Sequence, residues 1–275
     1  MGLDPALLPR VVRPGEVAGT VRDGHGLPFS KGTLVACGTG DNAAAALGLG
    51  VRPGTPVMSL GTSGTVYAVT QRRPADPTGT VAGFADARGD WLPLACTLNC
   101  TLAVDRVAAL LNLDREAVEP GRGVTLLPFL DGERTPNLPN SSGLLHGLRH
   151  DTTGGQLLQA AYDGAVYSLL AALDLVLDED ADPSAPLLLI GGGARGTAWQ
   201  QTVRRLSGRA VQVPQARNWS RSGRRRRRPG CSPARTRPRS PGAGTRRRAR
   251  CWRRCSGTRR RWPLWPGCSP TRPRC

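Results

Sequence analysis

The sequence predicts an α/β fold for residues 31–216. Three segments join a short apolar run to a turn of small residues, and two of them, "TLVACGTGDNAAAALGLGV" and "APLLLIGGGARGTAWQQTVRRL", continue into a stretch that can form a helix. Further apolar residues recur at helical spacing between these segments. Strands that alternate with helices are typical of α/β domains, and residues 31–216 are long enough to bury a substantial core.

The first elements are expected around residue 34. Residues 1–30 are rich in proline and glycine and predict extended pieces joined by turns, so we interpret them as an interdomain linker. After this linker, "TLVAC" predicts a strand, "GTG" predicts a tight turn, and the alanine-rich stretch that follows Asp41 predicts a helix.

The later elements follow in order along the chain. "TPVMSLGTSGTVYAVT" alternates on both sides of Gly61–Gly64 and predicts a β-hairpin with a turn of small residues. Apolar spacing predicts helices over Leu102–Leu111 and Gln156–Leu177. Leu187–Ile190 predict a strand, which "GGGARG" connects to a last helix.

The glycine turns are candidate phosphate-binding loops. Glycine lets backbone N–H groups approach a phosphate, and the start of a following helix favours negative charge. Taken singly, "GTSG" is explained equally well as a hairpin turn, and "GGGARG" as a strand-to-helix connection without a ligand. Neither has the spacing or the lysine of a P-loop, and neither fits the dinucleotide fingerprint.

Asp41 is the residue with the sharpest catalytic interpretation. We expect it at the end of a buried strand, on a glycine turn, where a general base could reach a substrate hydroxyl. Aspartate is also a common helix N-cap, and propensity alone favours that role. The local sequence leaves both roles open.

Charge divides the chain at residue 217. Residues 1–216 hold 17 basic and all 20 acidic residues, a net charge of −3, and the remaining 59 residues hold the other 21 of the 38 basic residues, all arginine. This Arg/Pro-rich segment has few apolar residues, so we expect residues 217–275 to be disordered. Its arginines would bind nucleic acid without sequence preference, and the charge says nothing about residues 1–216.

The cysteines and the apolar runs indicate a cytoplasmic protein without a metal site. Cys37, Cys96 and Cys100 resemble small buried hydrophobes of a reducing compartment. Cys251 and Cys255 lack the spacing and the second ligand pair of a zinc site. No apolar run approaches membrane-spanning length, and no partner in a membrane is expected.

Four motifs in order resemble the C-terminal domain of the xylulokinases, a group within the FGGY carbohydrate kinases. They are "CGTGDNAAAALGLGV", "SLGTSGTVYAV", "LLPFLDGERTPNLPNSSGLLHGL" and "LLLIGGGARGTAWQQTVRRLSGRAVQVP". Residues 143–163 also resemble the second signature of the family. The resemblance covers about residues 10–216 and implies an actin-like (ribonuclease H-like) ATPase domain, one of the two domains of a kinase whose active site lies between them.

The resemblance implies a role for each candidate site residue. Asp41 would accept the proton of the sugar hydroxyl that attacks ATP, and Asn42 would lie beside the sugar, D-xylulose or the substrate of another FGGY kinase. Mg²⁺ would bridge phosphate oxygens. The nucleotide would be bound by residues of three motifs and one helix: Gly61, Thr62, Ser63 and Gly64; Gly132; Gly192, Gly193 and Ala194; and Trp199.

Two departures from the family affect the expected activity. The N-terminal kinase domain, which would supply most sugar contacts, is not represented in this sequence, so we expect this chain alone to be inactive. A homodimer is left open.

The second departure is the arginine-rich end, where the family has an alanine-rich helix. GC-rich codons read out of frame give Arg, Pro, Gly, Ala, Cys and Trp. Reading Arg217–Ser240 from the third base of the Arg217 codon, with permitted codons, gives "ELVALGAAAQAAGLLTGEDPAEV", which has the pattern of that helix. We therefore predict that residues 217–275 are out of frame.

Overall fold

The structure is a computed structural model that describes residues 4–24, 26, 28–179 and 181–215. At its centre lies a mixed six-stranded sheet of order β10-β9-β3-β4-β6-β5. β10 and β3 pair parallel to β9, whereas β4 pairs antiparallel to β3 and β6, and β5 antiparallel to β6. The strands are β3 (Val57–Leu60), β4 (Gly64–Tyr67), β5 (Ala82–Ala85), β6 (Trp91–Thr97), β9 (Leu187–Ile190) and β10 (Val211–Gln212).

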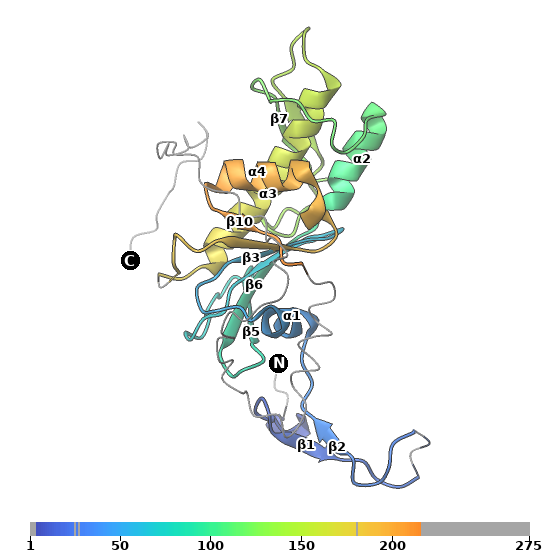
Figure 1. The fold of residues 1–275 in the computed structure, drawn as a ribbon, viewed down its shortest axis with the longest axis vertical. Coiled ribbons are helices and arrows are strands. Elements are labelled where there is room, and N and C mark those ends of the chain that lie inside the picture. Colours follow the sequence, from blue (N-terminus) through green and yellow to red (C-terminus); the bar gives the residue numbers. More distant parts are fainter. Residues whose placement is uncertain (1–3, 25, 27, 180, 216–275) are drawn as a thin grey trace, which may run out of the picture.

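Helices cover both faces of this sheet (Figure 1). α2 (Thr101–Leu111), α3 (Gly154–Val176) and α4 (Thr197–Ser207) pack on one face, against side chains such as Met58 and Leu60. α1 (Asp41–Leu49) packs on the other face, where Ala43 and Ala46 belong to one buried cluster with Tyr67. The fold is therefore the α/β fold that the alternation of strands and helices predicts.

Local sequence signals explain where the helices begin and end. Thr153 and Gln156 form a capping box at the start of α3, and each side chain accepts a hydrogen bond from the other residue's backbone N–H. Gly50 caps the C-terminal end of α1, and its left-handed backbone lets its N–H donate to carbonyl groups of the last turn. The short alanine side chains of α1 let its backbone lie close to the sheet.

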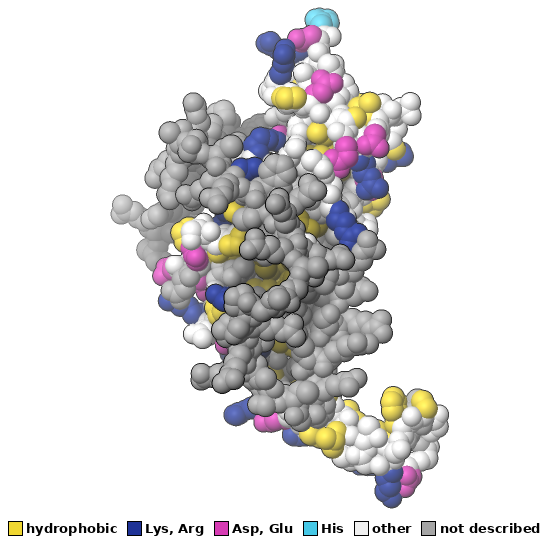
Figure 2. Space-filling view, viewed as in Figure 1, with side chains coloured by type: hydrophobic (Ala, Val, Ile, Leu, Met, Phe, Trp, Pro, Cys, Tyr) yellow, Lys and Arg dark blue, Asp and Glu magenta, His cyan; other side chains and the backbone are white. Residues whose placement is uncertain are grey.

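Two small hairpins lie outside the central sheet. β1 (Val17–Thr20) pairs with β2 (Leu34–Ala36) at the lower end of the molecule, and β7 (Thr125–Leu127) pairs with β8 (Leu144–His146) at the opposite end (Figure 1). Two 3-10 helices, Pro5–Leu7 (η1) and Gly193–Arg195 (η2), complete the described elements. Hydrophobic side chains are visible at the projecting lower end in Figure 2, where Val17 and Leu34 are exposed.

The structure confirms the expected hairpin at Gly61–Gly64, both long helices and the strand–turn–helix unit at residues 187–207. It corrects the expectation that the segment before Asp41 is a buried strand. β2 pairs only with β1, and Leu34 and Val35 are exposed. Because β1 lies before residue 30 and β2 after it, this hairpin spans the expected linker boundary, which stays a prediction.

The two faces of the strand Leu187–Ile190 differ in burial. Leu187 and Leu189 are fully buried against the α3 and α4 side. Leu188 and Ile190 are partly buried on the α1 side.

The nucleic-acid prediction and the out-of-frame prediction fall on residues 217–275, which lie outside the described residues. No helix in the described part of the chain combines the length and apolar character that crossing a bilayer requires.

Candidate functional site

Three strands end together at one edge of the central sheet. Leu60 at the end of β3 lies opposite Gly64, and Gly64 lies opposite Thr97 at the end of β6. On the other side of β3, Ser59 pairs with Ile190 at the end of β9. In open α/β sheets, ligands bind beyond the carboxyl ends of parallel strands. This edge is therefore the candidate site.

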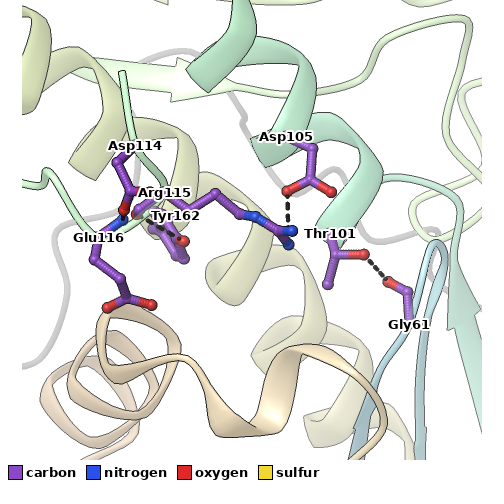
Figure 3. Close-up of polar contacts among 7 residues, drawn as sticks. All are labelled: Gly61, Thr101, Asp105, Asp114, Arg115, Glu116 and Tyr162. Carbon is purple, nitrogen blue, oxygen red and sulfur yellow. Dashed lines mark hydrogen bonds and ion pairs between the residues drawn. The ribbon is translucent and has the colours of Figure 1, made fainter.

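The "GTSG" turn is held by the first turn of α2. The N–H and the hydroxyl of Thr101 both donate to the Gly61 carbonyl, at 3.1 and 2.8 Å, and Figure 3 shows the hydroxyl contact. The N–H of Leu102 donates to the Thr62 carbonyl at 3.5 Å. The backbone N–H groups of Thr101 and Leu102 are among the first four of α2, which have no partners within the helix.

This anchoring decides where the turn's own N–H groups point. In a trans peptide the C=O and N–H are antiparallel across the planar unit. Because the Gly61 and Thr62 carbonyls point toward α2, the N–H groups of Thr62 and Ser63 point away from it. Both residues are exposed. The turn therefore presents two fixed donors outward, an arrangement that suits a phosphate oxygen.

The "GGGARG" turn packs against Leu60 and Thr101, which flank and hold the "GTSG" turn. A Cβ on Gly193 would lie 2.8 Å from Cγ2 of Thr101, and a Cβ on Gly191 would lie 2.5 Å from the Leu60 carbonyl oxygen. Gly192 is exposed and has ordinary backbone angles, and it differs from both in that an added Cβ would lie in open space. The fold itself does not require glycine there, whereas a ligand that approaches the backbone would.

Gly132 reaches the same region through the connection between β6 and α2. Its carbonyl accepts a hydrogen bond from Nδ2 of Asn99 at 2.8 Å, two residues before Thr101. It has a φ of 95°, and a Cβ would lie 2.4 Å from the Pro139 carbonyl oxygen. Both its conformation and its packing require glycine.

Asp41 and Asn42 begin α1, on the sheet face opposite α2–α4. Gly40 occupies the N-cap position, and Asp41 is the first helical residue. Oδ1 of Asp41 accepts the N–H of Asn42 at 2.8 Å, and the side chain is exposed. Its negative charge acts on the hydroxyl of Tyr67, whose pKa is raised by burial and, to a smaller degree, by Asp41.

Trp199 and Ala194 contribute to packing beside the turns. The Trp199 side chain is 2% exposed and meets the Tyr162 ring edge-on, with ring centroids 4.8 Å apart. An indole so placed has little surface left for an adenine ring, so any effect on a nucleotide would act through the position of α4. Ala194 is likewise buried, in the 3-10 turn after Gly193.

Comparison with known proteins identifies the family. Residues 57–221 match the description "FGGY family of carbohydrate kinases, C-terminal domain". The chain belongs to this family. The matched range contains every candidate site residue except Asp41 and Asn42.

Individual relatives of this FGGY chain are xylulose kinases. Over 216 residues it is 97% identical to the xylulose kinase of Streptomyces rubiginosus, and over 217 residues 91% identical to that of Streptomyces coelicolor. These matches cover 78% and 79% of this chain but 45% of either relative, so the chain spans about half of their length. The crystal structure of xylulose kinase from Bifidobacterium adolescentis is also similar, with a TM-score of 0.68 and 37% identity over 78% of this chain and 45% of that one. The fold is accordingly the actin-like ATPase fold of FGGY kinases.

A polar network supports the start of α4 in this FGGY domain. Arg115 forms an ion pair with Asp105 of α2 at 3.2 Å, and the Tyr162 hydroxyl donates to the Arg115 carbonyl at 3.1 Å (Figure 3). The neighbouring Glu116 accepts the N–H of Ala198 at 2.8 Å. Since Ala198 follows the "GGGARG" turn closely, this network fixes how that turn enters α4.

Sequence reasoning missed the residues that hold the turns together. Thr101, Asn99 and Glu133 connect three separate segments of the site. Glu133 follows Gly132 in the "DGERTP" motif, so this motif could have indicated Glu133 as a site residue. No local pattern marks Asn99 or Thr101.

Two further threonine hydroxyls line these segments without partners. Oγ1 of Thr97, at the end of β6, and Oγ1 of Thr135, in the "DGERTP" segment, are buried and have no hydrogen-bond partner among the described residues. A buried hydroxyl without a partner destabilises the fold, and such groups are often kept for a ligand or a water molecule.

Proposed function

We propose that this chain is the nucleotide-binding half of a cytoplasmic, ATP-dependent sugar kinase that converts D-xylulose to D-xylulose 5-phosphate. The observation that carries the proposal is the pair of adjoining turns at the carboxyl ends of β3 and β9, where Thr62, Ser63 and Gly192 present exposed backbone. The 97% identity to a xylulose kinase supports D-xylulose as the sugar. Another sugar of the FGGY family is the alternative.

The two turns would divide the nucleotide between them. The outward N–H groups of Thr62 and Ser63 would bind phosphate oxygens, and Gly61 and Gly64 would give the turn its shape. Gly192 and Gly193 would let the nucleotide approach the backbone closely. Gly132 and Ala194, both buried, would set the position of these turns rather than contact ATP.

Asp41 would act as the general base. Its carboxylate is exposed at the first residue of α1, so a sugar hydroxyl can reach it. The carboxylate would take the hydroxyl proton while the hydroxyl oxygen bonds to the γ-phosphorus and the bond from that phosphorus to the bridging oxygen of ADP breaks. Asn42, at the second residue of the helix, would lie beside the sugar.

The metal requirement is modest on the protein side. The described residues contain no group of three or more His, Cys, Asp or Glu suited to a metal ion. A magnesium ion typically keeps several waters and binds substrate phosphates together with one or two carboxylates. It therefore does not require a cluster of three or more protein ligands. Bound there, Mg²⁺ would neutralise charge on the phosphates; the protein would contribute donors and position.

The proposal is tested in two steps, because the chain spans 45% of its relatives. Calorimetry first measures binding of ATP to the 275-residue chain. The chain is then mixed with a polypeptide covering the part of the Streptomyces rubiginosus xylulose kinase that it does not match, and sugar phosphorylation is followed by ADP release.

We expect ATP binding by the chain alone and turnover of D-xylulose by the mixture. If the mixture binds ATP but prefers a different sugar, the sugar assignment is wrong and the kinase assignment stands. If the chain binds no ATP and the mixture transfers no phosphate, the proposal fails.

A further inference from the structure

Glu133 is a buried carboxylate with an unusual set of partners. Its side chain is 1% exposed. Oε1 accepts the backbone N–H groups of Leu98 at 2.6 Å and Arg134 at 2.7 Å. Oε2 accepts both the backbone N–H and the side-chain Nδ2 of Asn99, at 3.2 and 3.0 Å.

These four donors define what the carboxylate can do. An ionised carboxylate has about four lone-pair positions, and here each oxygen receives two N–H groups. No Lys, Arg or His within the described ranges forms an ion pair with it. Binding a metal would displace these donors, and the two that come from Asn99 are buried, so leaving them without an acceptor would cost free energy. The geometry therefore assigns Glu133 a structural link rather than a place in the chemistry.

The link runs between two parts of the candidate site. Glu133 follows Gly132, and Nδ2 of Asn99 contacts both the Glu133 carboxylate and the Gly132 carbonyl. Two residues after Asn99, Thr101 holds the Gly61 carbonyl of the "GTSG" turn. Only buried Cys100 separates the two anchor points.

We propose that Glu133 is a positioning residue that fixes the "GTSG" turn through Asn99 and Thr101. It would fix the start of α2 relative to Gly132. Thr101 would in turn fix the position of the "GTSG" turn, whose Thr62 and Ser63 N–H groups face outward. Its effect on ATP rests on the proposed function, whereas its effect on the turn does not.

The test compares Glu133→Gln with Glu119→Gln in the full chain. Glutamine keeps the shape of Glu133 but replaces one acceptor oxygen by an NH₂ group that faces N–H donors. Glu119 is exposed and accepts one hydroxyl, from Thr153, so its variant controls for the loss of a charge. Amide hydrogen exchange is measured under conditions in which all variants are folded, and ATP affinity is measured by calorimetry.

We expect Glu133→Gln to accelerate exchange at least tenfold at Leu98, Asn99 and Arg134 and also at Thr101 and Leu102, whose N–H groups donate to the Gly61 and Thr62 carbonyls. ATP affinity should fall about tenfold, and Glu119→Gln should change neither. Faster exchange confined to the three direct partners, with Thr101 and Leu102 unchanged, would overturn the proposal. If the unsubstituted chain binds no ATP, the proposed function fails and the exchange at Thr101 and Leu102 still decides the role of Glu133.

A second variant covers the case in which Glu133→Gln does not fold. Asn99→Ala removes the two side-chain bonds but leaves the carboxylate with three backbone donors. We expect it to accelerate exchange at Thr101 and Leu102 several-fold. Unchanged exchange there would equally contradict the proposed link.

Discussion

Asp41 is the one side chain whose proposed role is chemical. If it is the base, Asp41→Ala should leave ATP affinity within about twofold and lower kcat of the reconstituted kinase by about 10²–10⁴-fold, the usual contribution of general base catalysis. Asp23→Ala is the matched control, since Asp23 is an exposed carboxylate paired with Lys31. Equal kcat values for the two variants would remove Asp41 from the mechanism.

Gly192 and Gly132 should respond to alanine in opposite ways. The Cβ of an alanine at residue 192 would lie in open space, and the backbone angles there suit alanine. We therefore expect Gly192→Ala to change the free energy of unfolding by less than about 0.5 kcal/mol while ATP affinity falls. Gly132→Ala meets the Pro139 carbonyl at a φ of 95°, so we expect a loss of at least about 2 kcal/mol.

Urea denaturation and calorimetry measure the two quantities for both alanine variants. Gly79→Ala is the control for backbone strain alone, because Gly79 has a φ of 72° and open space around it. Full ATP affinity in Gly192→Ala would argue against a nucleotide at this turn.

Cys100 should be inert in the native chain. Its thiol is fully buried, and burial raises its pKa to about 12, so the reactive thiolate is scarce at pH 8.5. We expect iodoacetamide at this pH to modify Cys100 only after urea is added, whereas the partly exposed Cys37 reacts first. Peptide mass spectrometry measures both sites. Rapid native labelling of Cys100 would mean that the start of α2 opens readily.

Among the elements, α3 offers the clearest test of a local signal. Thr153→Ala removes the hydroxyl that accepts the Gln156 N–H at 3.2 Å, and loss of such a cap costs about 1 kcal/mol. Because α3 begins away from the candidate site, ATP affinity should not change. Thr153→Ser keeps the hydroxyl and should retain stability in urea denaturation. Loss of ATP binding in both variants would show that α3 is coupled to the nucleotide.

Elements with a local signal could be predicted from the sequence. The hairpin at Gly61–Gly64 and the helix that became α3 depend on alternation, turn residues and helical spacing within one segment. β5 and β6 were not predicted, and β6 reaches the central sheet by pairing with β4, some thirty residues earlier in the chain. β2 was predicted as a strand but not as an exposed one, since exposure depends on its pairing with β1 alone.

The candidate site divides in the same way. Glycine-rich turns are visible in the sequence, but the contacts that join them connect residues 33–40 positions apart. The role of Asp41 as a first helical residue rather than a cap depended on Gly40, which the propensity of aspartate does not reveal. Sequence reasoning therefore found the pieces of the site, and only the fold shows that Thr101 and Glu133 connect them.

At the scale of the whole molecule, two boundaries nearly coincide. The composition changes at residue 217, and the family match ends at residue 221. This coincidence supports the prediction that residues 217–275 are out of frame.

The last prediction concerns a chain with the frame restored. The coding DNA read in the alternative frame should encode a segment close to "ELVALGAAAQAAGLL", and a chain that carries it should be more soluble. An added helix could cover partly buried side chains such as Leu188 and Ile190, and each large apolar side chain removed from water contributes up to about 1.5–3 kcal/mol. We therefore expect a higher urea midpoint and tighter ATP binding.

Sugar phosphorylation should still require the complementary half, because positioning both reactants can lower a barrier by about 7–11 kcal/mol. DNA without this alternative reading would contradict the frame change. A restored chain with the same urea midpoint as the present one would contradict the idea that the helix covers the sheet.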